Sequence, residues 1–173
     1  MPAYDAAEYL PTAVASVLRQ TFADLELLII DDGSSDRTLD VAHACAARDS
    51  RIRILQQPHA GPGPARNFGF REAAGRFFAF LDSDDEWDET FLAEHVSVLA
   101  ARPDVDVVIG NARNRGGKRD GQPSRLLRGE GLPITLSVLY LHPVRRCVAF
   151  QDLEDTRRYV MGMHIDAHAS LLP

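Results

Sequence analysis

Short, largely apolar runs alternate with longer amphipathic stretches along residues 1–111. A short apolar run predicts a buried strand, and apolar residues that recur with the helical period predict a helix. The expected strands are 25–30, 52–55, 77–81 and 105–109. The expected helices are 5–20, 38–48, 65–74 and 90–101. This order predicts an α/β fold in which helices cover both faces of a mostly parallel sheet.

The start of the first helix has two interpretations. Asp5 and Glu8 have the spacing of a capping box. Pro11 instead favours a start near Leu10, because proline suits the first turn of a helix. Residues 1–4 lie where a doubly wound sheet normally has its first strand. We therefore expect them to be the exit of a strand whose body this chain lacks.

The composition is that of one ordinary globular domain. The chain has 173 residues, of which 45% are hydrophobic and 25% charged, enough to bury a core. The net charge of −6 argues against a broad nucleic-acid-binding surface. Cys45 and Cys147 are too few for a disulfide scaffold, and no apolar run reaches membrane-spanning length. These features favour a cytoplasmic protein, either free or held peripherally at the inner face of the membrane.

Three carboxylates follow the apolar run 77–81 directly. Asp82, Asp84 and Asp85 stand where this strand would leave the sheet, and ligands of open α/β sheets bind at that edge. Crowded carboxylates repel one another unless a positive charge lies between them. Mg²⁺ is suited to one or two carboxylates together with the oxygens of a diphosphate. A solvated acidic turn that caps the next helix is the alternative.

A second acidic pair, Asp31 and Asp32, follows the apolar run 25–30. If the two strands are neighbours, both acidic clusters face one pocket. Asx turns and helix caps offer another explanation for Asp and Ser residues here. Because Ser35 and Asp36 can supply that cap, we favour ligand contact for Asp32.

The Gly-Pro-Gly-Pro segment 61–64 predicts a loop that leads into the helix beginning near Ala65. Its two glycines superficially resemble a dinucleotide-binding loop. Pro62 and Pro64 have no backbone N–H, however, so we do not expect this segment to cradle a phosphate.

Five motifs in order along the chain resemble the family 2 glycosyltransferases. They are PAYD at 2–5, SVLRQTF at 16–22, IDDGSSDRT at 30–38, GPGPARN at 61–67 and FLDSDDEW at 80–87. The resemblance implies an inverting enzyme with a GT-A fold, a Rossmann-like α/β domain. We expect residues 1–173 to form a single such domain. Its nucleotide-sugar-binding part would be 1–111, and 112–173 would be an incomplete acceptor-side part.

The resemblance also implies roles for individual residues. It places a nucleoside-diphosphate sugar, expected to be UDP-linked, with Mn²⁺ or Mg²⁺ on its diphosphate. The implied nucleotide-binding residues are Pro2, Tyr4, Asp32, Arg66, Asp82 and Asp84, and the implied metal ligands are Asp84 and Asp85. Pro2 and Tyr4 would flank the base, Asp32 would bind it, and Arg66 would hold the nucleotide. The sugar would pass to a hydroxyl group of a saccharide or a lipid-linked acceptor.

The general base of such an enzyme is an acidic residue downstream of the metal motif. Glu154 and Asp155 form the acidic pair there, which makes Asp155 the candidate. Arg157 and Arg158 follow the pair, so a surface ion-paired turn is the favoured explanation. We expect part of the acceptor region to be missing, and this chain alone to be marginally stable or self-associating, with negligible transfer.

Two other functions compete with the glycosyltransferase hypothesis. A truncated domain could bind a nucleotide sugar without turning it over. A receiver-type phosphorylation domain also gathers acids at strand ends, but it needs a lysine on a late strand. The one lysine of this chain, Lys118, lies in a Gly-rich segment instead.

Overall fold

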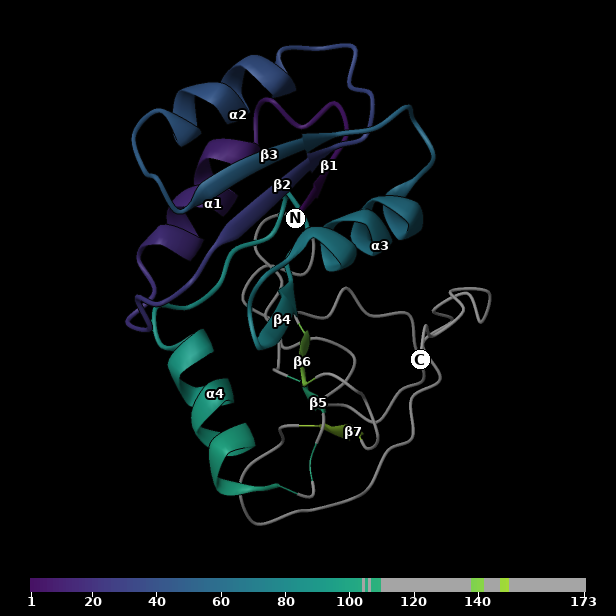
Figure 1. Cartoon of the computed structure of the whole chain (residues 1–173). Helices are drawn as coiled ribbons and strands as arrows, with labels where there is room; N and C mark the ends of the chain where they lie inside the picture. Colours follow the sequence, from purple (N-terminus) through teal and green to yellow (C-terminus); the bar gives the residue numbers. More distant parts are fainter. Residues whose placement is uncertain (104, 106, 110–137, 142–146, 150–173) are drawn as a thin grey trace, which may run out of the picture.

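The computed structural model describes residues 1–103, 105, 107–109, 138–141 and 147–149. Strands and helices alternate through most of this part, as predicted (Figure 1). The elements are β1 (Pro2–Ala3), α1 (Leu10–Leu18), β2 (Leu27–Asp31), α2 (Thr38–Ala46), β3 (Ile52–Gln56), α3 (Pro62–Glu72), β4 (Phe77–Phe80), α4 (Phe91–Ala101), β5 (Val107–Ile109), β6 (Val138–Leu141) and β7 (Cys147–Ala149). Among these helices, none is both long and apolar enough to cross a membrane.

The described strands form two sheets. The first has the order β1-β2-β3 and is parallel throughout, in agreement with the prediction. The second has the order β4-β6-β5-β7 and is mixed, because β6 runs antiparallel to both β4 and β5. Pro2 pairs with Ile30 and Ala3 with Asp31, so β1 ends beside the carboxyl end of β2.

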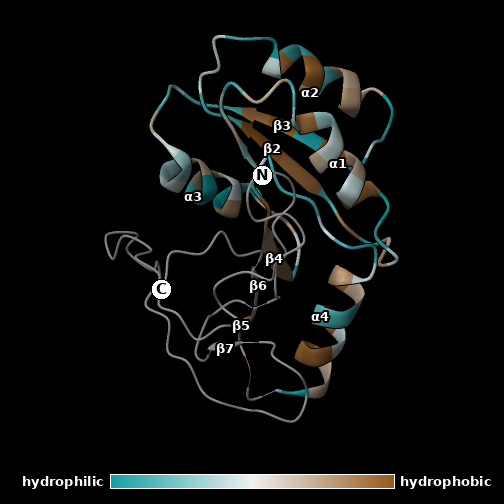
Figure 2. Cartoon of the chain, turned by 180° about the vertical axis from the view of Figure 1, so that it is seen from behind, coloured by the Kyte–Doolittle hydropathy of each residue, from teal (hydrophilic) through white to brown (hydrophobic). Residues whose placement is uncertain are grey.

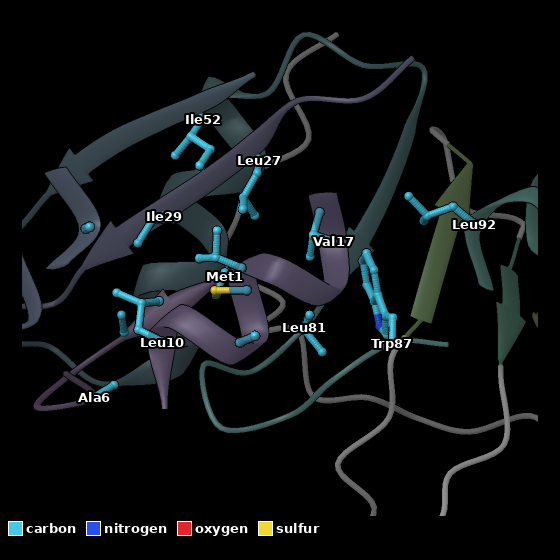
Figure 3. Close-up of a cluster of buried hydrophobic side chains, with 14 of the residues drawn as sticks. Met1, Ala6, Leu10, Val17, Leu27, Ile29, Ile52, Leu81, Trp87 and Leu92 are labelled. Atoms are coloured by element: carbon cyan, nitrogen blue, oxygen red, sulfur yellow. The ribbon is translucent and has the colours of Figure 1, made fainter. Parts of the chain in front are cut away.

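Strand β2 is buried on both faces, which explains its uninterrupted apolar sequence. Leu27 and Ile29 belong to the core that α1 and α2 cover (Figure 3). Leu28 and Ile30 point the other way and pack with Ala65 of α3. The strands are correspondingly brown in Figure 2, whereas teal polar residues lie in the loops and on the outer sides of the helices. Helices therefore cover both faces of the first sheet, as predicted.

Helix α1 begins at Leu10, with proline in its first turn. The start at Asp5 with a capping box is therefore wrong. Asp5 has a positive φ of 47°, a left-handed conformation that no helix continues. Its side chain is turned toward the loop before α2. Of the two sequence signals for the start of this helix, only Pro11 indicated the correct residue.

Helix α3 begins at Pro62, earlier than the predicted start near Ala65. Gly61 precedes it with a φ of 95°, which an L side chain rarely adopts. Pro62 and Pro64 then occupy the first turn, where a missing backbone N–H breaks no helical hydrogen bond. The prolines thus open the helix, and the loop before it is correspondingly shorter.

The apolar sequence of β4 predicted a strand buried on both faces, but the strand is only half-buried. Leu81, directly after the strand, is buried. Trp87 is also buried and stacks on Phe91 of α4, with ring centroids 4.7 Å apart. Figure 3 shows Trp87 and Leu92 at one end of the buried apolar cluster, and Leu81 nearer its middle. The segment that carries the acidic motif is thereby anchored at both ends by core side chains.

Candidate nucleotide-binding site

A concavity of about 280 Å³ lies at the carboxyl ends of β1, β2 and β4. It gathers all six residues that the sequence predicted to bind a nucleotide, together with four others. The lining residues are Pro2, Ala3, Tyr4, Asp32, His59, Pro62, Arg66, Asp82, Ser83 and Asp84. The two acidic clusters, 50 residues apart in the sequence at Asp32 and Asp82, therefore share one pocket. Asp85 does not line it, and Asp155 lies outside the described residues.

A larger hollow of about 590 Å³ lies between β2, α3 and β4. Its walls are mainly apolar side chains of these elements and of α4. Neither Asp32 nor the acidic cluster 82–85 reaches it. Since a charged ligand needs charged partners, the smaller pocket is the candidate site.

Asp32 is held by hydrogen bonds to the segment that follows β3. Its Oδ1 accepts from Gln57 Nε2 at 2.6 Å and from the Ala60 N–H at 3.0 Å. Its Oδ2 accepts from the Gly61 N–H at 2.8 Å and lies 3.0 Å from His59 Nδ1. Burial alone would raise the pKa of this carboxyl, but the hydrogen bonds and the His59 ring outweigh it and lower the pKa. Asp32 therefore fixes the shape of residues 57–61.

The aromatic pair Tyr4 and His59 forms one wall of the pocket. Their ring centroids are 4.1 Å apart and the planes are tilted by 33°. Both rings remain accessible, with Tyr4 48% exposed and the His59 side chain 55% exposed. Sequence reasoning missed His59. Its place just after a parallel strand was the available signal, because that edge collects ligand-binding residues.

Asp5 ties the loop after β1 to the loop after β2. Its Oδ1 accepts from the Ser35 N–H at 2.7 Å and from the Asp36 N–H at 3.2 Å. Its own N–H donates to Ser34 Oγ at 3.1 Å. Because Asp5 follows Tyr4 directly, this exchange holds the Tyr4 backbone in place beside the pocket.

The residues expected to cap α2 are used differently. Asp36 accepts from the Thr38 N–H at 2.8 Å, which is an Asx turn. The Ser35 hydroxyl donates to Asp5 instead of capping the helix. Arg37 is the N-cap residue and supplies no side-chain cap. The predicted capping role is therefore confirmed in part for Asp36 and is wrong for Ser35.

Arg66 of α3 binds Asp82 at the end of β4. Its guanidinium donates to Asp82 Oδ1 at 2.5 Å, and both side chains are partly exposed. This ion pair links the helix that covers the first sheet to the acidic cluster. It also compensates one of the three carboxylates, which leaves Asp84 and Asp85 as the remaining acids of the motif.

Asp84 and Asp85 carry charge that the protein does not fully compensate. The pKa of Asp85 is raised to about 6, first by burial and then by the neighbouring charges of Asp84 and Asp82. The Asp85 N–H donates to the Asp82 carbonyl oxygen at 3.1 Å, which closes the turn and keeps the carboxylates together. A divalent cation would relieve this repulsion, so the residues fit a Mn²⁺ or Mg²⁺ ion.

The carboxylates alone do not form a complete cation cage. Within the part of the chain that the structure describes, no three His, Cys, Asp or Glu side chains are arranged to hold a metal ion. Mg²⁺ commonly takes one or two protein carboxylates and completes its shell with phosphate oxygens and water. The arrangement therefore suits a metal that arrives with a diphosphate.

Comparisons with known proteins agree with this geometry. Residues 1–153 match the family described as Glycosyl transferase family 2. The uncharacterized glycosyltransferase YibD of Escherichia coli K12 is 35% identical over 136 residues, which cover 76% of this chain and 39% of YibD. The E. coli UDP-Glc:alpha-D-GlcNAc-diphosphoundecaprenol beta-1,3-glucosyltransferase WfgD is 40% identical over 112 residues, or 64% of this chain and 43% of WfgD.

The fold also matches a solved structure. The crystal structure of S. aureus TarS 1–349 in complex with UDP superposes with a TM-score of 0.60 at 25% identity. The match covers 77% of this chain and 36% of that one. The predicted GT-A fold is confirmed by this likeness. The chain spans about two fifths of the length of the curated relatives YibD and WfgD.

Proposed function

Because this chain belongs to glycosyl transferase family 2, we propose that it carries the donor site of an enzyme that moves a sugar from a nucleoside diphosphate to a hydroxyl group. The observation that carries the proposal is the single pocket in which Tyr4, Arg66, Asp82 and Asp84 meet. An aromatic ring suits a base, and a guanidinium beside carboxylates suits a metal-bound diphosphate. The names of WfgD and the TarS complex support a UDP-linked donor.

The nucleotide would lie across the pocket from Tyr4 to Asp84. Pro2 and Tyr4 would flank the base, and Asp32 would bind it, as the sequence predicted. Asp82 would contact the ribose, and Arg66 would face the diphosphate. Asp84 and Asp85 would hold Mn²⁺ or Mg²⁺, which neutralises charge on the departing nucleoside diphosphate when it is bound. Residues 1–111 would thus serve as the nucleotide-sugar-binding part.

Transfer with inversion requires a base that deprotonates the acceptor hydroxyl. Asp155 stays the predicted candidate for this role, and it lies outside the described residues. The acceptor would be a saccharide or a lipid-linked hydroxyl. The name of WfgD, which includes a diphosphoundecaprenol, supports the lipid-linked alternative.

Nucleotide-sugar binding without transfer is the second candidate function. It rests on the donor pocket alone, because the candidate base Asp155 lies outside the described residues. The family match decides against the receiver-type phosphorylation domain.

Calorimetric titration of the 173-residue chain with UDP, in Mn²⁺ and in EDTA, tests the donor site. We expect binding that depends on the metal. Asp84→Asn and Asp85→Asn should each abolish this dependence without unfolding the chain, because each removes a metal ligand. Asp40→Asn, an exposed change on α2, is the matched control and should bind like the wild type.

The outcome that contradicts the proposal is UDP binding with unchanged metal dependence in both variants. Release of UDP from a UDP-sugar in the presence of acceptor glycans then separates the two candidate functions. Turnover supports transfer, and tight binding without turnover supports the binding-only alternative.

A further inference from the structure

The apolar hollow of about 590 Å³ between β2, α3 and β4 lies along the edges of two strands. On one side its walls belong to the core that includes Val17, Leu27 and Trp87. On the other side they belong to the cluster that Leu28 and Ile30 form with α3. Successive residues of a strand point to opposite faces of a sheet, so a space bordered by both Leu27 and Leu28 runs beside β2. All four residues of β4 border it as well.

The edge of β2 that faces the hollow is only partly paired, because β1 has two residues and β2 has five. The Ile30 N–H donates to the Met1 carbonyl oxygen, and the Met1 nitrogen donates to the Leu28 carbonyl oxygen, each at 2.9 Å. Alternate residues of a strand bond to the same neighbour, so the next donor along this edge is the Leu28 N–H. Met1 has no further carbonyl oxygen for it. Leu28 is buried, and an unsatisfied buried N–H costs free energy.

Strand β4 borders the hollow from the other side. Among the described strands it stands at the end of the second sheet and pairs with β6 alone. The carboxyl ends of β1, β2 and β4 meet at the nucleotide pocket, so a segment that enters the hollow in the direction of β1 would run parallel to both flanking strands. The lengths of β4 and β2 give such a segment four or five residues.

Trp87 shows that the hollow suits a ligand with hydrogen-bond acceptors. Its ring borders the hollow and is buried, and within the described part of the chain its indole N–H has no hydrogen-bond partner. A hydrocarbon chain would leave this N–H and that of Leu28 without an acceptor, which is costly. A peptide brings one carbonyl oxygen per residue and fills the apolar space as well. An extended polypeptide therefore fits better than a lipid chain.

We propose that this hollow is a strand-acceptor site, which binds one extended apolar segment of a partner polypeptide between β2 and β4. In this mode of recognition, backbone hydrogen bonds supply affinity and the side-chain pockets supply selectivity. Because apolar walls lie on both faces, every residue of the segment should be apolar, and valine and isoleucine suit such a strand. Its carboxyl end would lie against Met1 and its amino end beside Asp24 and Glu26. Occupancy requires no nucleotide, so the site goes beyond the proposed donor binding.

Fluorescence titration of the 173-residue chain with a synthetic peptide tests the site. Trp87 is the one tryptophan of the chain and borders the hollow, so its emission reports occupancy directly. The probe has two lysines for solubility, followed by five alternating valine and isoleucine residues and a carboxamide. We expect a change in emission that saturates at one peptide per chain.

The matched control probe is the same peptide with a methyl group on every second backbone nitrogen. It keeps the apolar side chains but cannot pair fully with a strand edge. We expect it to bind at least about tenfold more weakly, because hydrogen bonds to the strand edges are lost.

A pair of variants locates the binding. Ala73 is half-buried on the wall of the hollow, so Ala73→Phe should fill part of the space and weaken the peptide about tenfold. Ala44→Phe makes the same change at an exposed position of α2 outside the hollow and should leave the affinity unchanged. Melting curves of each variant show whether the fold is intact.

Three outcomes would overturn the proposal. The first is the lack of a saturable change, or equal binding of the methylated peptide. That comparison uses only the wild-type chain, so it decides the question even if a variant does not fold. The second is displacement of the peptide by dodecanoic acid at equal or higher affinity, which would make the hollow a lipid site. The third is dimerisation of the chain in sedimentation experiments that competes with the peptide, which would make a second copy the occupant.

Discussion

At the scale of single residues, Asp85 has the clearest electrostatic signature in the site. Its pKa is raised from 3.8 to about 6 by burial and by two neighbouring carboxylates. In the unfolded chain the same group ionises at its ordinary pKa. The folded state therefore holds the proton more tightly, and ionisation of Asp85 costs native stability as pH rises between these two values. Above about pH 6 the full cost is present.

Asp85→Asn should therefore raise the melting temperature of the metal-free chain at about pH 8 and have little effect near pH 4, because the substitution removes a charge that is present only at the higher pH. Thermal unfolding followed by circular dichroism at both pH values checks this. Asp88→Asn, an exposed acid nearby, is the control and should change neither curve. An equal effect of Asp85→Asn at both pH values would contradict the assigned cause.

At the scale of elements, the site depends on how closely α3 approaches β2. Gly69 of α3 has no side chain where Ile30 of β2 passes. A Cβ at Gly69 would lie 2.7 Å from Ile30 Cδ1, closer than two carbon atoms allow. The lack of a side chain at Gly69 therefore allows the helix that carries Arg66 to lie this close to β2.

Gly69→Ala should destabilise the chain by about 1–3 kcal/mol, because the added methyl group displaces the buried side chain of Ile30. Urea unfolding measures the change. Gly63→Ala provides the matched control in the same helix, since nothing lies within 4 Å of its added Cβ. That change should be neutral or slightly stabilising, because alanine favours the helix more than glycine does. Equal losses in both variants would show that packing against Ile30 is unimportant.

At the scale of the whole molecule, the pocket lies where elements of the two described sheets meet. Its walls come from β1, β2, the start of α3 and the end of β4. Asp82 follows β4 of the second sheet, and Arg66 belongs to α3, which packs on the first sheet. Their ion pair therefore joins these two parts at the site. A ligand that bridges these walls stabilises their arrangement as a unit.

UDP with Mn²⁺ should raise the melting temperature of the chain, by an amount equivalent to about 2.7 kcal/mol at a hundredfold excess over Kd. Differential scanning fluorimetry measures the shift. Arg66→Lys should reduce it, because lysine cannot make a bidentate contact with phosphate. Inorganic phosphate with Mn²⁺ is the ligand control and should give a much smaller shift. A shift that is unchanged in Arg66→Lys would remove Arg66 from the site.

The sequence by itself determined the strands β2 and β4, the helices that cover the first sheet, and the acids at the strand ends. These features are local. The period of apolar residues reports which face of an element is buried, and an acid directly after a strand stands at the sheet edge wherever the strand lies. The prolines in the first turns of α1 and α3 are local signals as well. Pro11 predicted the start of α1 correctly, whereas Pro62 and Pro64 were assigned to a loop.

Only the tertiary structure decided how the side chains of the site are used. Asp32 takes its partners from 25 to 29 residues away, and Asp5 takes its partners from the loop before α2. His59, which follows β3, meets Tyr4, which follows β1, across the strand β2 that lies between them. The raised pKa of Asp85 likewise depends on burial. Hydrogen bonds and desolvation are short-range in space and independent of distance along the chain, so neither a motif nor a periodicity contains them.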